Sequence, residues 1–203
     1  MTIADFWFDP ACPYTWITSR WLLEAAEVRP IEVRWHVLSL SVLNEDREDD
    51  PENDPEGYLW LPVRVCAAVA VEHGQEALGR FYTALGHRLH EGDGEWDPDA
   101  FATALAEAGL PTELTRAALT EEYDPAVRAS HWEGIAKIGT HVGTPIIVAT
   151  GADGAESAFF GPVVSRVPRG EEAGRLWDGT LLVAGIEGFH ELKGAPHAPP
   201  DFS

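Results

Sequence analysis

The chain carries IADFWFDPACPYTW at residues 3–16, and this run sets its first strand and its first helix. Aromatic and branched residues dominate 3–8, as is typical of a buried strand. Pro13 suits the first position of a helix, because the N–H that proline lacks would have no partner there. Apolar side chains then recur at roughly helical spacing. The sequence therefore predicts a strand over 3–8 and a helix that opens at Pro13 and is closed by Pro30.

The next segment, IEVRWHV at residues 31–37, alternates strictly between apolar and polar residues. This alternation predicts a strand with one buried face. A strand, a helix and a strand joined by short connections form a βαβ unit, whose strands pair in parallel through a right-handed crossover. The first part of the chain is therefore expected to begin an α/β sheet.

A long block without any strand pattern follows. Residues 44–56 are rich in Asp, Glu, Asn and Pro and predict a solvated loop. Beyond that loop, four helical stretches are expected. They are residues 62–90 with a break near Gly74, a helix capped by Asp97 and opened by Pro98 that stops near Gly109, a short one after Pro111, and a last one from Asp124-Pro125 to Gly139.

The β pattern returns after Gly143-Thr144-Pro145. It predicts, in order, a strand over 146–149, a turn over 151–154, a strand over 157–160, a helix from Pro168 or Arg169 to Leu192, and an irregular tail from Gly194. The whole order is β-α-β, a helical block, then β-β-α. This order indicates an α/β, thioredoxin-like fold with an all-helical domain inserted after the second strand. The expected domains are residues 1–43 with 140–203, and the inserted 44–139.

The composition of the chain limits the partners and the cellular location that we expect. The chain of 203 residues has a formal net charge of −20, and a surface this acidic repels phosphate backbones and anionic lipids. No apolar run approaches the length of a membrane span, and the first residues lack the basic and apolar regions of a signal peptide. Two cysteines are too few for a disulfide scaffold. We therefore expect no nucleic-acid or membrane partner, and a location in the reducing cytoplasm.

Cys12 lies at the predicted junction between the first strand and the first helix. The unpaired N–H groups of a first helical turn, together with the helix dipole, stabilise an anion at that point. A thiol there is expected to have a lowered pKa and to act as a nucleophile in disulfide exchange or thiol conjugation. The alternative is a small buried apolar residue. Cys66, among apolar residues of a predicted helix, is expected to pack in the core, with a distal resolving thiol as the alternative.

Aromatic side chains are candidates for lining a substrate cleft between the two domains, although aromatic residues more often pack in a core. The candidates are Trp7, Tyr14, Trp16, Trp21 and Trp60, of which Tyr14 and Trp21 are preferred. The histidines give no metal-ligand spacing, and we expect no metal. They include His36, which is expected to be structural, and His87, His90, His131 and His141.

The residues around Cys12 resemble those of the DsbA-like thioredoxin-fold proteins. The resemblance is closest to the actinobacterial mycothiol-dependent nitroreductase (mycoredoxin-like) family, and it continues in the same order along nearly the whole chain. Its landmarks are FWFDPACPYTW at 6–16, WITSRW at 16–21, PVRV at 62–65, VGTP at 142–145, FFGPV at 159–163 and PRGEEAG at 168–174.

Relatives in this family commonly carry Cys-Pro-Trp-Cys where this chain has Cys12-Pro13-Tyr14-Thr15. Because Thr15 replaces the second thiol, the resemblance implies a monothiol cycle in place of the dithiol oxidation of proteins. It also implies a cis peptide bond between Thr144 and Pro145, whose main-chain groups would meet a thiol substrate. The Thr15 hydroxyl could donate a hydrogen bond to the thiolate. The expected catalytic residues are Cys12, Thr15 and Pro145, and the expected substrate-binding residues are Pro13, Tyr14, Trp21 and Thr144.

The resemblance implies a thiol-disulfide oxidoreductase. Mycothiol, a low-molecular-weight thiol, would be the reductant, and mixed disulfides or small electrophiles such as nitroaromatic compounds would be the substrates. No metal and no tightly bound nucleotide or flavin is expected. Two alternatives stay open: a thiol transferase or isomerase like the kappa-class glutathione transferases, which activates a thiol cofactor, and a non-catalytic binding module that keeps the fold. The sequence leaves the oligomeric state open, a homodimer included.

Overall fold

Four strands form one mixed sheet in the computed structural model, which describes residues 1–49, 51–92 and 98–202. The strands are β1 (Thr2–Phe8), β2 (Ile31–Val37), β3 (Ile146–Thr150) and β4 (Glu156–Phe160), in the order β2-β1-β3-β4 across the sheet. β1 pairs in parallel with β2 and antiparallel with β3, and β3 and β4 form an antiparallel hairpin. β1, the strand that leads to Cys12, therefore lies inside the sheet.

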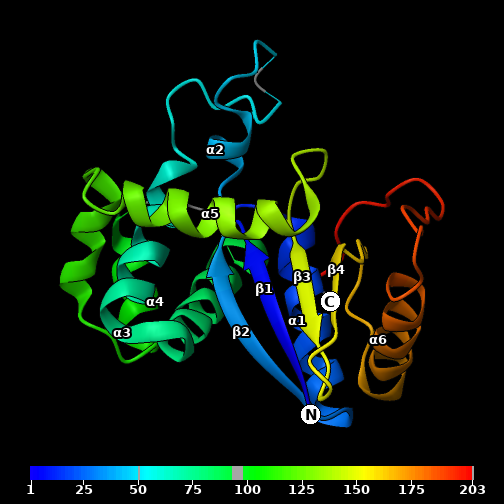
Figure 1. Ribbon diagram of the computed structural model, residues 1–203. Helices are drawn as coiled ribbons and strands as arrows, with labels where there is room; N and C mark the ends of the chain where they lie inside the picture. Colours follow the sequence, from blue (N-terminus) through cyan, green and yellow to red (C-terminus); the bar gives the residue numbers. More distant parts are fainter. Residues whose placement is uncertain (50, 93–97, 203) are drawn as a thin grey trace.

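Helices surround this sheet (Figure 1). They are α1 (Pro13–Val28), α2 (Leu40–Asn44), α3 (Trp60–Gly86), the π-helical segment η1 (His87–Glu91), α4 (Pro98–Glu107), the 3-10 segment η2 (Thr112–Leu119), α5 (Asp124–Ile138) and α6 (Gly170–Ala184). α1 lies behind the sheet, α5 crosses in front of its upper end, and α3 and α4 stand beside β2. α6 lies on the other side of the molecule, beyond β4.

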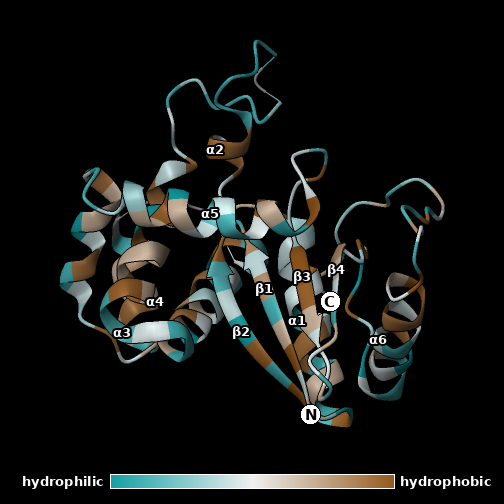
Figure 2. Cartoon of the chain, in the orientation of Figure 1, coloured by the Kyte–Doolittle hydropathy of each residue, from teal (hydrophilic) through white to brown (hydrophobic). Residues whose placement is uncertain are grey.

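Apolar side chains from the sheet and the helical block meet in one large core. It joins Phe6 and Phe8 of β1 to Trp16 of α1 and to Val65 and Phe81 of α3, and all five are buried. Figure 2 shows β3 as almost wholly apolar and the segment above α2 as hydrophilic. Because the helices share a core with the sheet, they hold the end of β1, and the loop that follows it, in place.

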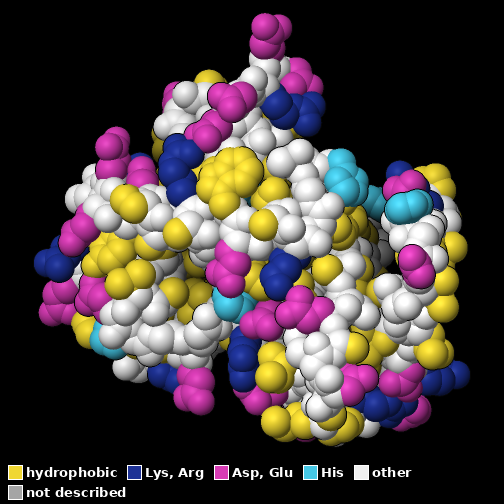
Figure 3. Space-filling view, in the orientation of Figure 1, with side chains coloured by type: hydrophobic (Ala, Val, Ile, Leu, Met, Phe, Trp, Pro, Cys, Tyr) yellow, Lys and Arg dark blue, Asp and Glu magenta, His cyan; other side chains and the backbone are white. Residues whose placement is uncertain are grey.

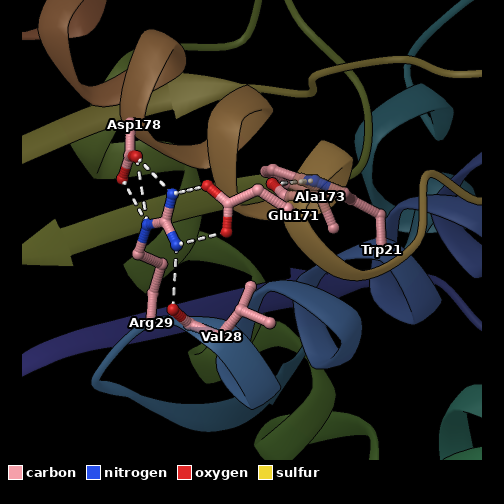
Figure 4. Close-up of polar contacts among 6 residues, drawn as sticks. All are labelled: Trp21, Val28, Arg29, Glu171, Ala173 and Asp178. Atoms are coloured by element: carbon pink, nitrogen blue, oxygen red, sulfur yellow. Dashed lines mark hydrogen bonds and ion pairs between the residues drawn. The ribbon is translucent and has the colours of Figure 1, made fainter.

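The C-terminal end of α1 is tied to α6. Arg29, which follows α1, forms ion pairs with Glu171 at 2.7 Å and Asp178 at 2.8 Å (Figure 4). On the preceding turns, the indole Nε1 of Trp21 donates a hydrogen bond to the main-chain oxygen of Ala173 at 3.1 Å. These contacts fix α6 against α1, and therefore fix the point from which the last part of the chain departs.

The predicted order of strands and helices is confirmed, and so is the break in α3, where Gly74 has a φ of 80°. The expected end of the last helix at Leu192 is wrong, because α6 ends at Ala184. Gly185 is its C-cap, and Gly188 follows with a φ of 81°. Two glycines so close together favour the end of a helix over its continuation.

The short helix α2 was not predicted. Ser39 caps it, and the Ser39 hydroxyl accepts the N–H of Val42 at 3.2 Å. The predicted cap Asp97 lies outside the described residues, and the domain boundaries at residues 43 and 140 stay a prediction. Among the residues that the structure describes, no helix is long and apolar enough to cross a membrane.

Candidate active site

Cys12 stands at the N-cap of α1, as the sequence predicts. Its φ and ψ of −78° and 114° are extended, and Pro13 takes the first helical position. The Cys12 carbonyl oxygen accepts the N–H of Trp16 at 3.0 Å, and its own N–H donates to the carbonyl oxygen of Asp9 at 3.2 Å. The residue is partly exposed. The start of α1 therefore presents its free N–H groups beside a sulfur atom that a reagent can approach.

Burial of the sulfur is the largest influence on the pKa of Cys12, and it raises that pKa. Three donors oppose it: the Thr15 hydroxyl, the Thr15 N–H and the Tyr14 N–H. The negative charge of Asp9 acts with the burial, and the net effect is a pKa above the ordinary value. The expected lowering of the Cys12 pKa is therefore wrong. The helix-end donors are present, but tertiary burial outweighs them.

Asp9 is a site residue that the sequence reasoning missed. It is fully buried, and its carboxylate accepts the N–H of Ala11 at 2.9 Å and the N–H of Leu40 at 2.7 Å. Burial raises the pKa of Asp9 to about 7, although those two hydrogen bonds act to lower it. Its negative charge also raises the pKa of Cys12. The available signal was an acidic residue at the end of a buried strand, three positions before Cys12.

The hydroxyl groups of Thr15 and Thr144 lie 3.2 Å apart, so the structure brings the motif and the Thr144-Pro145 loop together. Thr144 Oγ1 also accepts the N–H of Asp9 at 3.2 Å and contacts the carbonyl oxygen of Trp7 at 3.4 Å. The peptide bond between Thr144 and Pro145 is cis, as expected. Thr15 is fully buried and Thr144 nearly so. The two hydroxyls therefore join the cis-proline loop to the cysteine motif inside the protein.

Two further residues are close to the cysteine loop. Tyr14 follows Cys12 in the sequence, and His90 contacts Pro10, which precedes it. The Tyr14 hydroxyl donates to the carbonyl oxygen of Ala198 at 3.0 Å. His90, in η1, contacts the carbonyl oxygen of Pro10 through Nε2 at 2.9 Å. Since a carbonyl can accept but not donate, Nε2 carries the hydrogen, and burial lowers the pKa of His90. His90 was expected to bear no metal-ligand role, and its position beside the cysteine loop was not anticipated.

Trp21 was expected to bind substrate, and this prediction is wrong. Its side chain is fully buried, its ring lies 6.1 Å from that of Trp177, and its indole N–H is used by Ala173. Trp7 and Trp16 are buried as well, and their indole N–H groups donate to Ser130 and to Glu91, respectively. Aromatic spacing on a helix shows which side a ring is on, but not whether a ligand or another helix meets it.

Cys66 is fully buried in α3, and burial raises its pKa well above the ordinary value. The expected packing role is confirmed. His36 forms an ion pair or hydrogen bond with Asp5 at 2.7 Å on the sheet, and its ring stacks on Trp7 at 4.3 Å, as a structural histidine would. No group of three or more metal-ligating side chains occurs within residues 1–49, 51–92 and 98–202.

The family of the chain follows from its sequence. Residues 11–194 match the model of the Rv2466c-like family, described as mycothiol-dependent nitroreductase Rv2466c. The chain belongs to this family. The family match begins one residue before Cys12 and runs to the residue after Lys193. The family places the chain among thiol-dependent oxidoreductases, and it supports a thiol as the co-substrate.

A curated relative covers almost the whole length. It is the uncharacterized protein Rv2286c of Mycobacterium tuberculosis, which is 31% identical over 207 residues, 99% of this chain and 85% of the relative. Solved structures share the DsbA-like thioredoxin fold. The cytosolic disulfide reductase DsbM of Pseudomonas aeruginosa has a TM-score of 0.57 and 18% identity, over 89% of this chain and 98% of that one. A probable DsbA oxidoreductase, SCO1869 of Streptomyces coelicolor, gives 0.56 and 18% over 100% and 98%.

Proposed function

We propose that Cys12 is the nucleophile of a monothiol cycle that uses mycothiol to reduce mixed disulfides or small electrophiles. The observation that carries the proposal is the position of Cys12, which is partly exposed at the N-cap of α1, next to Thr15, whose hydroxyl lies 3.2 Å from that of Thr144 at the cis Thr144-Pro145 bond. The Thr15 hydroxyl and the N–H groups of Thr15 and Tyr14 are the donors that act to lower the pKa of Cys12. Donors fixed by the fold stabilise a thiolate when it forms or leaves, without reorganisation. The same donors fit the sulfur of a low-molecular-weight thiol, which would be consumed as a substrate.

In the proposed cycle, the Cys12 thiolate attacks one sulfur of a mycothiol mixed disulfide. A bond forms between Cys12 and that sulfur, the original S–S bond breaks, and the second thiol leaves and takes up a proton. Because Thr15 stands where a resolving cysteine would be, a further low-molecular-weight thiol releases the adduct and ends in the disulfide. For a nitroaromatic substrate, oxidation of two thiols to one disulfide would supply the two electrons and two protons that turn a nitro group into a nitroso group and water.

The raised pKa of Cys12 gives Asp9 a place in this cycle. Asp9 is buried beneath the cysteine loop, and its pKa is raised to about 7. Protonation of Asp9 removes a negative charge that disfavours the Cys12 thiolate. We therefore infer that the thiolate is favoured when the Asp9 carboxyl group is neutral.

Intact-protein mass spectrometry after incubation with mycothiol disulfide tests the proposal. One mycothiol adduct is expected on the wild type and on a Cys66→Ser control, and none on Cys12→Ser. In parallel, NADPH consumption in the presence of mycothiol, its reductase and a nitroaromatic compound is expected to fall to background in Cys12→Ser. Equal rates in wild type and Cys12→Ser would remove Cys12 from the mechanism.

A second candidate is a kappa-class-like thiol transferase or isomerase. The observation in its favour is the raised pKa of Cys12, because a protein thiol held in its neutral form leaves the donors of Thr15 and Tyr14 to activate the thiol of a bound substrate. The mass measurement separates the two candidates, since this one predicts turnover without a covalent adduct. Either reaction would need a pool of reduced small thiols, and we place the protein in the cytoplasm on that ground.

A further inference from the structure

The last part of the chain returns to the site of Cys12. In Figure 1 the red segment leaves the region of α6, arches over the upper right and turns back toward the sheet, so that the C label falls beside β4. We call residues 194–202 the strap. It contains no helix or strand, and its side chains are exposed except for those of Pro200 and Phe202, which are partly buried.

One contact of the strap is made with the residue two positions after Cys12. The Tyr14 hydroxyl donates to the carbonyl oxygen of Ala198 at 3.0 Å, and the Tyr14 ring lies 5.4 Å from the ring of His197. These residues are separated by 184 positions in the chain. The contact uses the hydroxyl at the end of the Tyr14 side chain. This hydroxyl takes no part in the backbone hydrogen bonds of the first turn of α1.

Other contacts of the strap are made with His90 and Ser165. The Phe202 ring packs at the edge of the core, 6.1 Å from the ring of His90. His90 in turn donates to the carbonyl oxygen of Pro10, two positions before Cys12. The N–H of Asp201 donates to the carbonyl oxygen of Ser165 at 2.7 Å, which anchors this end of the strap. The strap therefore contacts Tyr14 after Cys12 directly, and it is linked to Pro10 before Cys12 through His90.

The strap has no regular backbone pairing with the rest of the chain. Its attachments include the hydrogen bonds at Ala198 and Asp201 and the partly buried ring of Phe202. A segment with exposed side chains and no regular backbone pairing opens at a small fraction of the free energy of global unfolding. Opening is therefore expected on the timescale of loop motions, without any change in the sheet or in α1.

We propose that the strap is a removable wall of the Cys12 site, so that Tyr14, His197 and Phe202 decide which thiols and disulfides reach the sulfur. The proposal rests on the proposed function of Cys12 as a nucleophile. A small reagent passes beneath or beside the closed strap. A large co-substrate, such as a thiol built on a sugar scaffold, has to displace it.

The test compares two uncharged reagents that form mixed disulfides with Cys12, the small methyl methanethiosulfonate and the larger 4,4′-dithiodipyridine. Rates are measured on the whole chain, on a chain that ends at Lys193, and on Tyr14→Phe, with mass spectrometry to locate the modified residue. For the shortened chain, the rate with the larger reagent is expected to rise by about fivefold more than the rate with the small one, which corresponds to the loss of about one hydrogen bond. Tyr14→Phe is expected to change the ratio in the same direction.

A matched control separates the strap from general loosening of the chain. Phe202→Ala is expected to act like the shortened chain, whereas Phe189→Ala, which removes a partly exposed ring before the strap, is expected to leave the ratio unchanged. An unchanged ratio in the shortened chain and in Tyr14→Phe would overturn the strap as a wall, while leaving Cys12 reactive. Failure of Cys12 to react with the small reagent in every variant would instead contradict the proposed function, and the strap proposal with it.

Discussion

Thr15 has one hydroxyl hydrogen and two neighbours that can accept it. One is Oγ1 of Thr144 at 3.2 Å, and the other is the sulfur of Cys12. The hydroxyl hydrogen of Thr144 has a partner of its own in the carbonyl oxygen of Trp7. We therefore expect the Thr15 hydrogen to point at Thr144 while the sulfur is neutral, and to turn to the sulfur when it becomes an anion.

Replacing Thr15 tests this residue. Thr15→Val removes the hydroxyl and keeps the shape, and it is expected to raise the pKa of Cys12 by about 1, because a hydrogen bond to a charged group contributes about 1.5 kcal/mol. The pKa is read from the pH dependence of iodoacetamide alkylation. Thr15→Ser keeps the hydroxyl and should resemble the wild type. Identical pKa values in the valine and serine variants would mean that the hydroxyl does not reach the sulfur.

Asp9 links the site to the pH dependence of stability. Its pKa is about 7 in the folded protein and about 3.9 in an unfolded chain. Between these values the folded state binds a proton that the unfolded state has released, so the contribution to stability is complete below about pH 4 and is lost as pH rises through 7. Asp9→Asn cannot ionise and removes this contribution to the slope.

Urea unfolding at pH 5 and pH 8 measures the effect. On going from pH 5 to pH 8, the wild type is expected to lose on the order of 2 kcal/mol more than Asp9→Asn. Both proteins share every other titrating group, so the difference isolates Asp9. Parallel losses in the two proteins would show that Asp9 titrates at its ordinary value.

At the scale of elements, α1 serves two ends of the molecule. Its first turn holds Cys12, and its later turns carry Trp21, which packs on α6 and donates to Ala173. The pairing of α1 with α6 is completed by Arg29, whose guanidinium lies where a side chain at Gly174 would stand, since an added Cβ would be 2.8 Å from it. The later turns of α1 therefore anchor the helix to α6, whereas its N-terminal end positions the nucleophile.

Trp21→Phe tests whether the two ends of α1 act separately, one in stability and the other in the reactivity of Cys12. Loss of the indole hydrogen bond and of buried ring volume is expected to lower the free energy of unfolding by about 2 kcal/mol. The rate of Cys12 alkylation should stay within twofold of wild type at temperatures where both are folded. Trp132→Phe, at a half-exposed position on α5, is the control and should change neither quantity appreciably. A large change in the affinity for thiol substrate in Trp21→Phe would restore Trp21 to the binding site.

The limits of sequence reasoning also appear at this scale. The alternation over 31–37 and the proline at 13 specify β2 and the start of α1 through local patterns, and both are observed. Asp9 could not be assigned in this way, because one of its hydrogen-bond donors, the N–H of Leu40, lies 31 positions away. The predicted direction of the Cys12 pKa shift was wrong for the same reason. The sequence shows the local donors at the start of the helix, but it does not show the tertiary burial that outweighs them.

At the scale of the whole molecule, charge is the dominant property. The formal net charge is −20, from 34 acidic and 14 basic residues. Figure 3 shows acidic side chains spread over the face in view, and they are not gathered at one place. A field of this kind acts on every charged molecule that approaches, and it weakens when salt shortens the screening length.

The salt dependence of Cys12 labelling tests this property. Raising the salt from about 10 mM to about 500 mM is expected to speed the reaction with the dianion 5,5′-dithiobis(2-nitrobenzoate) by about tenfold. The uncharged 4,4′-dithiodipyridine should react at a nearly constant rate over the same range. Equal salt dependence for the two reagents would indicate that the field at Cys12 is locally neutralised.

The complete burial of Cys66 has a practical consequence. With 0% of the residue exposed in α3, an alkylating reagent can reach its sulfur only after α3 has separated from its neighbours in the core. In a variant that lacks Cys12, the extent of Cys66 labelling therefore measures the fraction of molecules in which the core has opened around α3. The rate of Cys66 labelling therefore reports how often the core opens. It can be measured for each substitution described above without an added dye or tag.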